Sequence, residues 1–164
     1  MEMEQDQKGL TLIETMMVFA IIGILVTIAI PPAYQAYEDS VAREQVTEAI
    51  SLLNAAKAPI AGFYADKGRW PTRPEFDNLV AAQTGKYVAN LSPLSLAPGF
   101  QVTATFKNNG VSAGLLKEGT GRTLVVATKD GVVWVCNDDI DPVTGVPGLI
   151  AGNVLAEHRP QACK

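Results

Sequence analysis

Apolar side chains fill almost every position of residues 10–30, and the single charged residue among these twenty-one is Glu14. The hydrocarbon core of a lipid bilayer is about 30 Å thick, and about 20 apolar residues in an α-helix cross it. The segment is therefore long and apolar enough to span a membrane. Pro31 and Pro32 follow it directly. Because proline kinks a helix without having to end it, we expect the helix to continue.

Apolar positions beyond these prolines recur at steps of three and four residues: Val46, Ala49, Ile50, Leu53, Ala56 and Ile60. This period predicts an amphipathic helix. We therefore predict one helix from residue 10 to about residue 58, with Pro59 and Gly62 marking its end. A membrane anchor followed by a separate soluble helix is the alternative. It is disfavoured because only the two prolines lie between the segments.

The pattern then changes to a loop over residues 63–71 and a second, short helix. Thr72 and Glu75 have the spacing of a capping box, and Pro74 suits the first helical turn. These residues predict a helix over residues 74–83 that Gly85 stops. The apolar residues that it would bury are Phe76, Leu79 and Val80.

Stretches rich in β-branched and aromatic residues predict four strands, at residues 86–91, 100–107, 123–128 and 132–136. Lys129-Asp130-Gly131 between the last two is typical of a hairpin turn, and Asn108-Asn109-Gly110 is a second turn candidate. The predicted fold is α+β. A long N-terminal helix, with a transmembrane half and an amphipathic half, packs its second half on a four-stranded antiparallel sheet.

Charge argues against a general attraction to nucleic acid. The chain of 164 residues has a net charge of −4, of which residues 1–9 contribute −2, so the remainder carries −2. A small basic patch with one aromatic residue lies in the predicted loop: Lys67, Arg69, Trp70 and Arg73. Such a patch could contact DNA phosphates and a base. A solvated loop with a packed tryptophan is the favoured interpretation.

The two cysteines, Cys136 and Cys163, predict a disulfide that closes a loop-like tail over residues 137–164. Two thiols and the single histidine, His158, are too few for an ordinary four-ligand zinc site, and we expect this histidine at the surface. A disulfide requires an oxidising compartment, and the periplasm or exterior of a Gram-negative bacterium fits best. The sequence has no catalytic constellation and no phosphate-binding loop, so we expect neither enzymatic activity nor a cofactor.

Residues 8–31 closely resemble the prepilin signature of the type IV pilin family, and the rest of the chain resembles that family in outline. A secretory signal places its small residue after the apolar run, whereas Gly9 precedes it here. Leu10, Thr11, two aliphatic residues and Glu14 follow, as in the family. Two features depart from the pattern: Leu10 stands where phenylalanine is usual, and the leader is acidic rather than basic.

The resemblance implies roles for individual residues. A prepilin peptidase would cut between Gly9 and Leu10, and the new N-terminal Leu10 would be methylated. Glu14 would direct assembly by pairing with the N-terminal amine of a neighbouring subunit. In the filament, the helix would lose regular hydrogen bonds between Gly23 and Pro31. The resulting organisation is a leader at residues 1–9, a transmembrane and assembly helix at residues 10–30, and a head domain of the pilin fold at residues 31–164.

The function that this resemblance implies is structural. Before assembly, the subunit would be embedded in the lipid of the inner membrane, with its N-terminus in the cytoplasm and its head in the periplasm. Pilus assembly machinery would then build it into an extracellular homopolymer. Such filaments serve adhesion and twitching motility, and in some members DNA uptake.

A pseudopilin of type II secretion, or a minor or DNA-binding competence pilin, is the alternative. Pseudopilins of that kind bind calcium in a C-terminal loop and generally lack the terminal disulfide. Three acids in the tail, Asp138, Asp139 and Asp141, bear on this choice because oxygen-rich loops can hold calcium. Their spacing does not match an EF-hand, so a solvated turn is the favoured interpretation.

Overall fold

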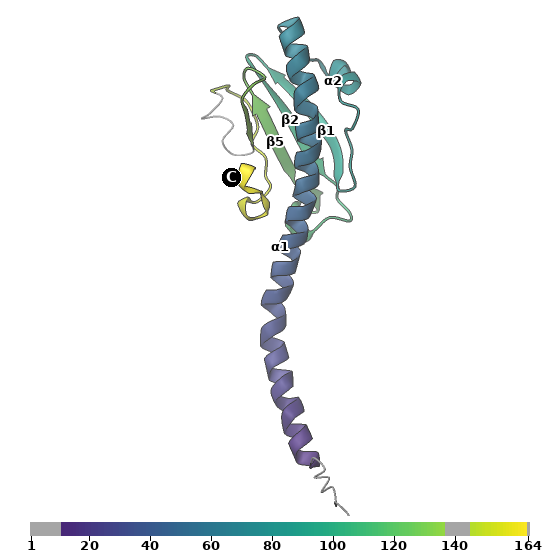
Figure 1. The fold of residues 1–164 in the computed structure, drawn as a ribbon, viewed down its shortest axis with the longest axis vertical. Helices are drawn as coiled ribbons and strands as arrows, with labels where there is room; N and C mark the ends of the chain where they lie inside the picture. Colours follow the sequence, from purple (N-terminus) through teal and green to yellow (C-terminus); the bar gives the residue numbers. More distant parts are fainter. Residues whose placement is uncertain (1–10, 137–144, 164) are drawn as a thin grey trace, which may run out of the picture. The chain divides into compact units, whose positions relative to one another are not determined.

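The computed structural model describes residues 11–136 and 145–163 (Figure 1). The chain divides into two compact units, Met1–Tyr37 and Glu38–Lys164. Helix α1 (Leu12–Lys67) supplies the described part of the first unit and continues into the second. We call the second unit the head. The predicted aspartate cluster at residues 138, 139 and 141 and the proposed cut after Gly9 lie outside the described residues.

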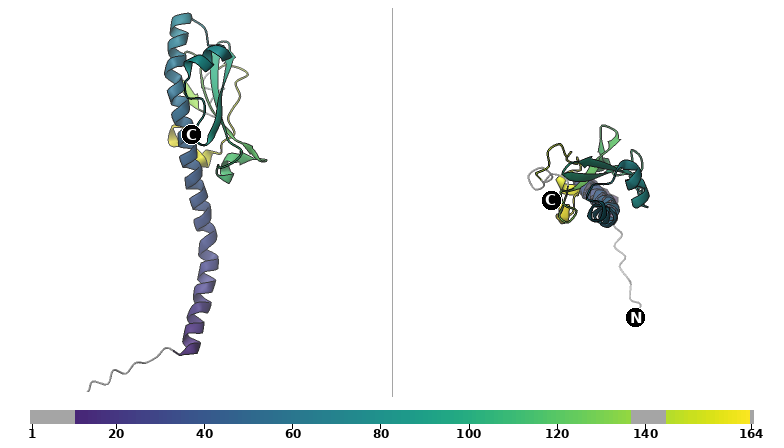
Figure 2. Two further views of the ribbon diagram at one scale, coloured as in Figure 1. Left: turned by 90° about the vertical axis from the view of Figure 1, so that its right-hand side faces the viewer. Right: turned by 90° about the horizontal axis from the view of Figure 1, so that it is seen from above.

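The amphipathic stripe of α1 forms one wall of the core of the head. Its predicted residues are fully buried except Ile50, which is partly buried against the same cluster, and Ala42 one turn earlier is fully buried as well. This part of α1 lies along one face of a β-sheet (Figure 2). Sheet residues complete the same cluster, notably Phe100, Val102, Phe106 and Leu124. The spacing of three and four residues in the sequence therefore identified the packed face correctly.

Helix α1 ends at Lys67, so the predicted end near residue 58 was wrong. Pro59 deletes one helical hydrogen bond, but the turns that follow bury Ile60 and pack Tyr64 against the core, which favours continuation. Gly68 ends the helix instead. Its φ of +65° is in the left-handed region, and its N–H donates to the Tyr64 carbonyl at 2.9 Å.

Four antiparallel strands form the sheet of the head: β1 (Val88–Leu96), β2 (Gly99–Phe106), β5 (Thr123–Thr128) and β6 (Trp134–Cys136). Their order is β1-β2-β5-β6, so β1 and β6 are the edges. The predicted α+β class, with a long helix on a four-stranded antiparallel sheet, is confirmed. On the other face, Val125 and Ala127 pack with Val135 and Leu149, so part of the tail covers that face.

Other predicted boundaries were inaccurate as well. Strand β1 extends to Leu96, beyond the predicted residue 91, because Pro93 lies on an edge strand, where a missing N–H costs no ladder bond. Helix α2 (Arg73–Leu79) ends before residue 83, although the capping box at Thr72 is present. Strand β6 begins at Trp134 rather than 132, because the Asp130 carboxylate holds the preceding N–H groups in the turn.

Short elements that the pattern did not predict complete the head. A 3-10 turn, η1 (Ala113–Leu115), leads into a separate hairpin of β3 (Leu116–Lys117) and β4 (Thr120–Gly121). Two further 3-10 turns, η2 (Ala156–His158) and η3 (Gln161–Cys163), lie in the tail. These elements have two or three residues each, which is too short for a hydrophobic period to reveal.

Candidate assembly segment and disulfide-closed region

The apolar segment of α1 has all its described large side chains exposed. The exposed fraction is 78% for Leu12, 73% for Phe19 and 59% for Ile30. Within the described ranges, α1 is the one helix long and apolar enough to cross a membrane. An apolar surface of this extent requires lipid or other protein chains around it.

Polar groups inside this segment are nearly all satisfied within the helix. The Thr15 hydroxyl donates to the Leu12 carbonyl at 2.8 Å, and the Thr27 hydroxyl donates to the Ile24 carbonyl at 2.7 Å. Glu14 lies exposed in the first turn, and within residues 11–136 and 145–163 its carboxylate has no hydrogen bond or ion pair. Glu14 is therefore the charged group of the described part of this segment that still requires a partner.

The backbone between Gly23 and Pro31 is helical in the single chain. A Cβ built at Gly23 would have no heavy atom within 4 Å, so no contact inside the subunit requires glycine there. The predicted loss of helix in this span concerns the assembled filament. It stays a prediction.

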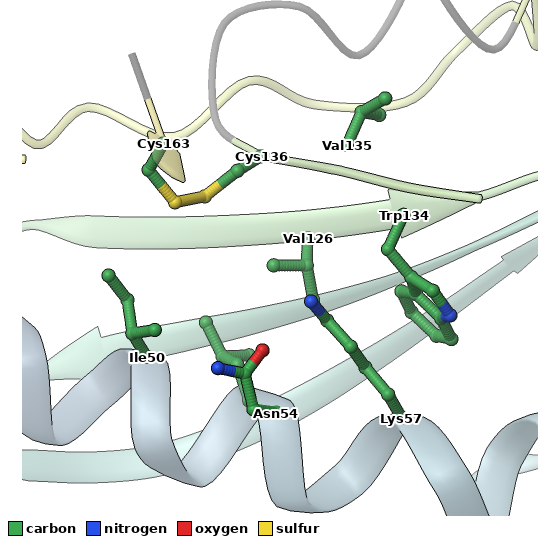
Figure 3. Close-up of a pocket in the computed structure, with 9 residues that line it drawn as sticks. Ile50, Asn54, Lys57, Val126, Trp134, Val135, Cys136 and Cys163 are labelled. Carbon is green, nitrogen blue, oxygen red and sulfur yellow. A yellow bond between two sulfur atoms is a disulfide. The ribbon is translucent and has the colours of Figure 1, made fainter. Parts of the chain in front are cut away.

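Cys136 and Cys163 form the predicted disulfide, with their Cα atoms 5.0 Å apart (Figure 3). The bond joins the edge strand β6 to η3 across a sequence separation of 27 residues. It ties the tail to the edge of the sheet.

A cavity of about 80 Å³ adjoins the disulfide, between α1 and strands β5 and β6. In Figure 3, Asn54 and Lys57 extend from α1 toward this space, and Trp134 borders it. The ammonium of Lys57 lies 5.8 Å from the centroid of the Trp134 ring. Burial lowers the pKa of Lys57, because a partly desolvated ammonium loses hydration.

Side-chain amides fasten the tail to the outer face of the sheet. Buried Gln101 accepts the Ile150 N–H at 2.8 Å and donates to the Ile150 carbonyl at 2.9 Å. The Asn153 side-chain carbonyl accepts the Thr123 N–H at 2.6 Å, and the Asn153 backbone N–H donates to the Thr123 carbonyl at 2.9 Å. These bonds hold the tail in place independently of the disulfide.

His158 is buried, with 3% of its surface exposed, so the prediction of a surface histidine was wrong. Its imidazole packs against Gly114, where any Cβ would collide with it. Nδ1 lies 3.8 Å from a carboxylate oxygen of Asp39, and Nε2 lies 3.7 Å from one of Glu157. Arg43 of α1 donates to the Glu157 carbonyl at 2.8 Å, so η2 is fastened to α1. No local sequence signal indicates this burial, because it depends on the path of the tail.

The tryptophan of the basic patch belongs to the core, as the favoured interpretation expected. Trp70 stacks on Tyr64 with ring centroids 3.9 Å apart, and its indole N–H donates to the Pro98 carbonyl at 2.8 Å. It is therefore not available to stack on a nucleic-acid base. Arg69 forms an ion pair with Glu75. Arg73 forms an ion pair with Asp77 at 3.1 Å.

The Arg69–Glu75 pair gives a pH prediction. Hydrogen bonds from the Arg69 side chain first, and then from Thr72, hold the pKa of Glu75 well below its usual range. Because this pKa is lower in the folded than in the unfolded chain, the carboxylate stabilises the fold above about pH 4, and this contribution is lost as the pH falls further. We expect Glu75→Gln in detergent to have a lower urea midpoint than wild type at pH 7 and a smaller further loss toward pH 3.

Asp66→Asn is the matched control, because Asp66 is exposed and has no ion pair among the described residues. Its urea midpoint should follow that of wild type at each pH. If the urea midpoints of Glu75→Gln and wild type fell by the same amount between pH 7 and pH 3, this carboxylate would not contribute to acid sensitivity.

Comparison with known proteins adds evidence independent of the geometry. Residues 42–164 match a family model described as pilin, of bacterial filaments, and residues 5–30 match the prokaryotic N-terminal methylation motif. The second match contains both Gly9 and Glu14.

Individual relatives cover most of the chain. A fimbrial protein, EcpC, of Eikenella corrodens is 39% identical over 142 residues, which are 85% of this chain and 88% of the relative. The type IV major pilin protein PilE of Neisseria gonorrhoeae is 34% identical over 169 residues, which cover 96% of this chain and 94% of the relative. A fimbrial protein of Neisseria meningitidis serogroup A is 32% identical over 173 residues, with the same coverage.

Proposed function

The chain belongs to the type IV pilin family and is a structural subunit of a pilus, and from this premise we propose that it is the major subunit, which polymerises through its N-terminal helix. The observation that carries the proposal is the apolar segment of α1. Its large side chains are exposed along the whole described stretch, as a polymerising helix requires. Adhesion and motility are typical roles of the family.

The proposed life of the subunit has two stages. As a precursor it spans the inner membrane of a Gram-negative bacterium through residues 10–30, with residues 31–164 in the periplasm. A prepilin peptidase removes residues 1–9, and Leu10 is methylated. The assembly machinery then transfers the helix from lipid into the filament, where lipid contacts are replaced by contacts between apolar helices. Support comes from the methylation motif over residues 5–30 and from the candidate membrane helix.

The proposal is tested by mass spectrometry of filaments sheared from the cell surface. We expect this chain to be the dominant protein, starting at a methylated Leu10 and lighter by two hydrogens because of the disulfide. If the chain is only a trace component of the filaments, it is a minor pilin. An intact Met1 on exported protein would refute the proposed processing.

The processing step makes its own prediction. Gly9→Val adds a branched side chain where the peptidase would grip the backbone, so we expect almost all subunits to stay as full-length precursor in the inner membrane. Immunoblotting separates the precursor from the nine-residue-shorter product. Gln7→Val is a control because it changes the same leader away from the cut. Normal maturation of Gly9→Val would contradict the assignment of the cleavage site.

A further inference from the structure

The hairpin of β3 and β4 carries an acidic residue in an unfavourable backbone conformation. In Figure 2 this hairpin, in green, projects away from the four-stranded sheet. Its turn residues Glu118 and Gly119 have φ values of +52° and +78°. Positive φ at both positions is typical of a type I′ turn, which favours asparagine followed by glycine. Glutamate is disfavoured there because its Cβ crowds the backbone, and an outlier of this kind suggests a function.

Glu118 is also exposed and has no partner in the described part of its own subunit. Most described acids of the head are engaged: for example, Glu48 accepts the Tyr87 N–H, Asp130 caps the β5–β6 turn, and Glu75 pairs with Arg69. The exceptions besides Glu118 are Glu44 and Asp66, which both lie on α1. Glu118 is the exception that projects from the head.

A base with no counter-ion among the described residues lies at the cavity beside the disulfide. Lys57 is half buried, and no described carboxylate lies within ion-pair distance of its ammonium. The Trp134 ring and the Asn54 amide border the same space. The ammonium is already partly desolvated and has lost favourable interactions with water. A carboxylate that entered this space would replace them with an ion pair.

The two groups lie toward opposite ends of the same sheet. Strand β4 ends at Gly121, just before the start of β5, whereas Trp134 pairs with Thr128 at the end of β5. A six-residue strand is about 17 Å long, so Glu118 and Lys57 cannot meet within one subunit. An acid at one end and a base toward the other are suited to a head-to-tail contact between identical copies, which is the kind of contact that builds helical filaments.

We propose that Glu118 of one copy binds Lys57 at the cavity of a neighbouring copy in the filament. This inference rests on the proposed function, because it requires a homopolymer. The hairpin would supply a rigid, projecting carboxylate, and the cavity would supply the ammonium, the Asn54 amide and the Trp134 ring. The pair would fix the orientation of one head relative to the next, in addition to the contacts of the N-terminal helix.

Charge reversal tests the pairing. We expect Lys57→Glu and Glu118→Lys each to lower the yield of sheared filaments, relative to total membrane subunit, at least tenfold. The double variant, which restores opposite charges, should recover at least half of the wild-type yield. Lys117→Glu is the matched control, because it reverses a charge on the neighbouring hairpin residue, and it should assemble within twofold of wild type.

A second variant separates assembly from folding. Glu118→Asn suits the type I′ turn better than glutamate, so the full chain in detergent should unfold at the same temperature or higher, while filament yield falls several-fold. Wild-type yield from both single reversals, or a double variant no better than the singles, would overturn the pairing. Because wild-type cells are compared in parallel, missing wild-type filaments would instead count against the proposed function.

Discussion

Replacing Glu14 with valine is expected to leave membrane insertion intact and to lower the yield of sheared filaments at least tenfold. Insertion should not suffer, because valine is easier to place in hydrocarbon than a carboxylate. Assembly should suffer because the proposed partner of Glu14 is the N-terminal amine that the cut creates at Leu10. Without Glu14, this amine would be buried among apolar helices with no opposite charge.

The size of the effect follows from the cost of an unpaired buried charge. Removing one partner of a buried ion pair typically costs about 3–5 kcal/mol, which corresponds to a hundredfold or larger change in an equilibrium constant. Residues 11–40 contain no lysine or arginine, so this part of the chain offers no other cation. The Thr15 and Thr27 hydroxyls bond to carbonyls of their own helix, and a neutral hydroxyl cannot replace the charge of Glu14.

The measurement is an immunoblot of sheared filaments against total membrane subunit. Glu14→Asp keeps the charge on a shorter side chain and should be intermediate. Thr15→Val is the matched control, because the Thr15 hydroxyl is satisfied by the Leu12 carbonyl, and its yield should equal that of wild type. Normal yield and filament length from Glu14→Val would show that this charge does not direct assembly.

Regular features of the fold could be predicted because each rests on a local pattern. The three-and-four spacing of Val46 to Ile60 identified the buried face of α1, and the β-branched run of residues 123–128 identified β5 with both its ends. The capping box at Thr72 located the start of α2. In these places local preference and tertiary packing favour the same structure.

Predictions failed where distant contacts outweigh a local preference. Pro59 suggests a helix end, but Tyr64 stacks on Trp70 and keeps the last turns of α1 in place. Pro93 suggests a strand end, but β1 is an edge strand that tolerates it. His158 is buried because the tail crosses Gly114 and is bonded to α1, and nothing near it in the sequence encodes that path.

Polar residues of the candidate sites show the same division. Glu14 stands out in the sequence because a lone acid in an apolar run is costly and therefore informative. Glu118 and Gln101 do not stand out, since an acid in a turn and an amide in a strand are ordinary. Their significance comes from the fold: a positive φ in the first case, and a tail segment lying over the sheet in the second.

Loss of the disulfide is expected to destabilise the head strongly. The bond joins residues 27 apart, and a ring of this size restricts the unfolded chain enough to stabilise the fold by roughly 3–4 kcal/mol, on a loop-entropy model. For a chain of this length we expect Cys136→Ser to lower the unfolding temperature by on the order of 10 °C. Fewer subunits should then reach the filament, because partly unfolded heads are more readily degraded.

The tail should not detach completely in this variant. The Gln101–Ile150 and Asn153–Thr123 bonds hold it to the outer face of the sheet, and Arg43 holds η2 to α1. We therefore expect a cooperative but earlier unfolding transition. Faster proteolysis should occur near residue 163, with residues 149–154 still protected. Cys163→Ser is the matched variant and should give the same shift, because it removes the same bond from the other side.

Thermal unfolding of the full chain in detergent, with and without reductant, decides the prediction. Reductant should lower the unfolding temperature of wild type to that of Cys136→Ser and leave the variant unchanged. Intact mass after alkylation without reduction should show no modified cysteine in wild type. If both thiols are alkylated in the native protein, the bond is absent in the cell. The head would then hold its tail through non-covalent contacts, among them those of Gln101, Asn153 and Arg43. The argument for an oxidising compartment would lose its support.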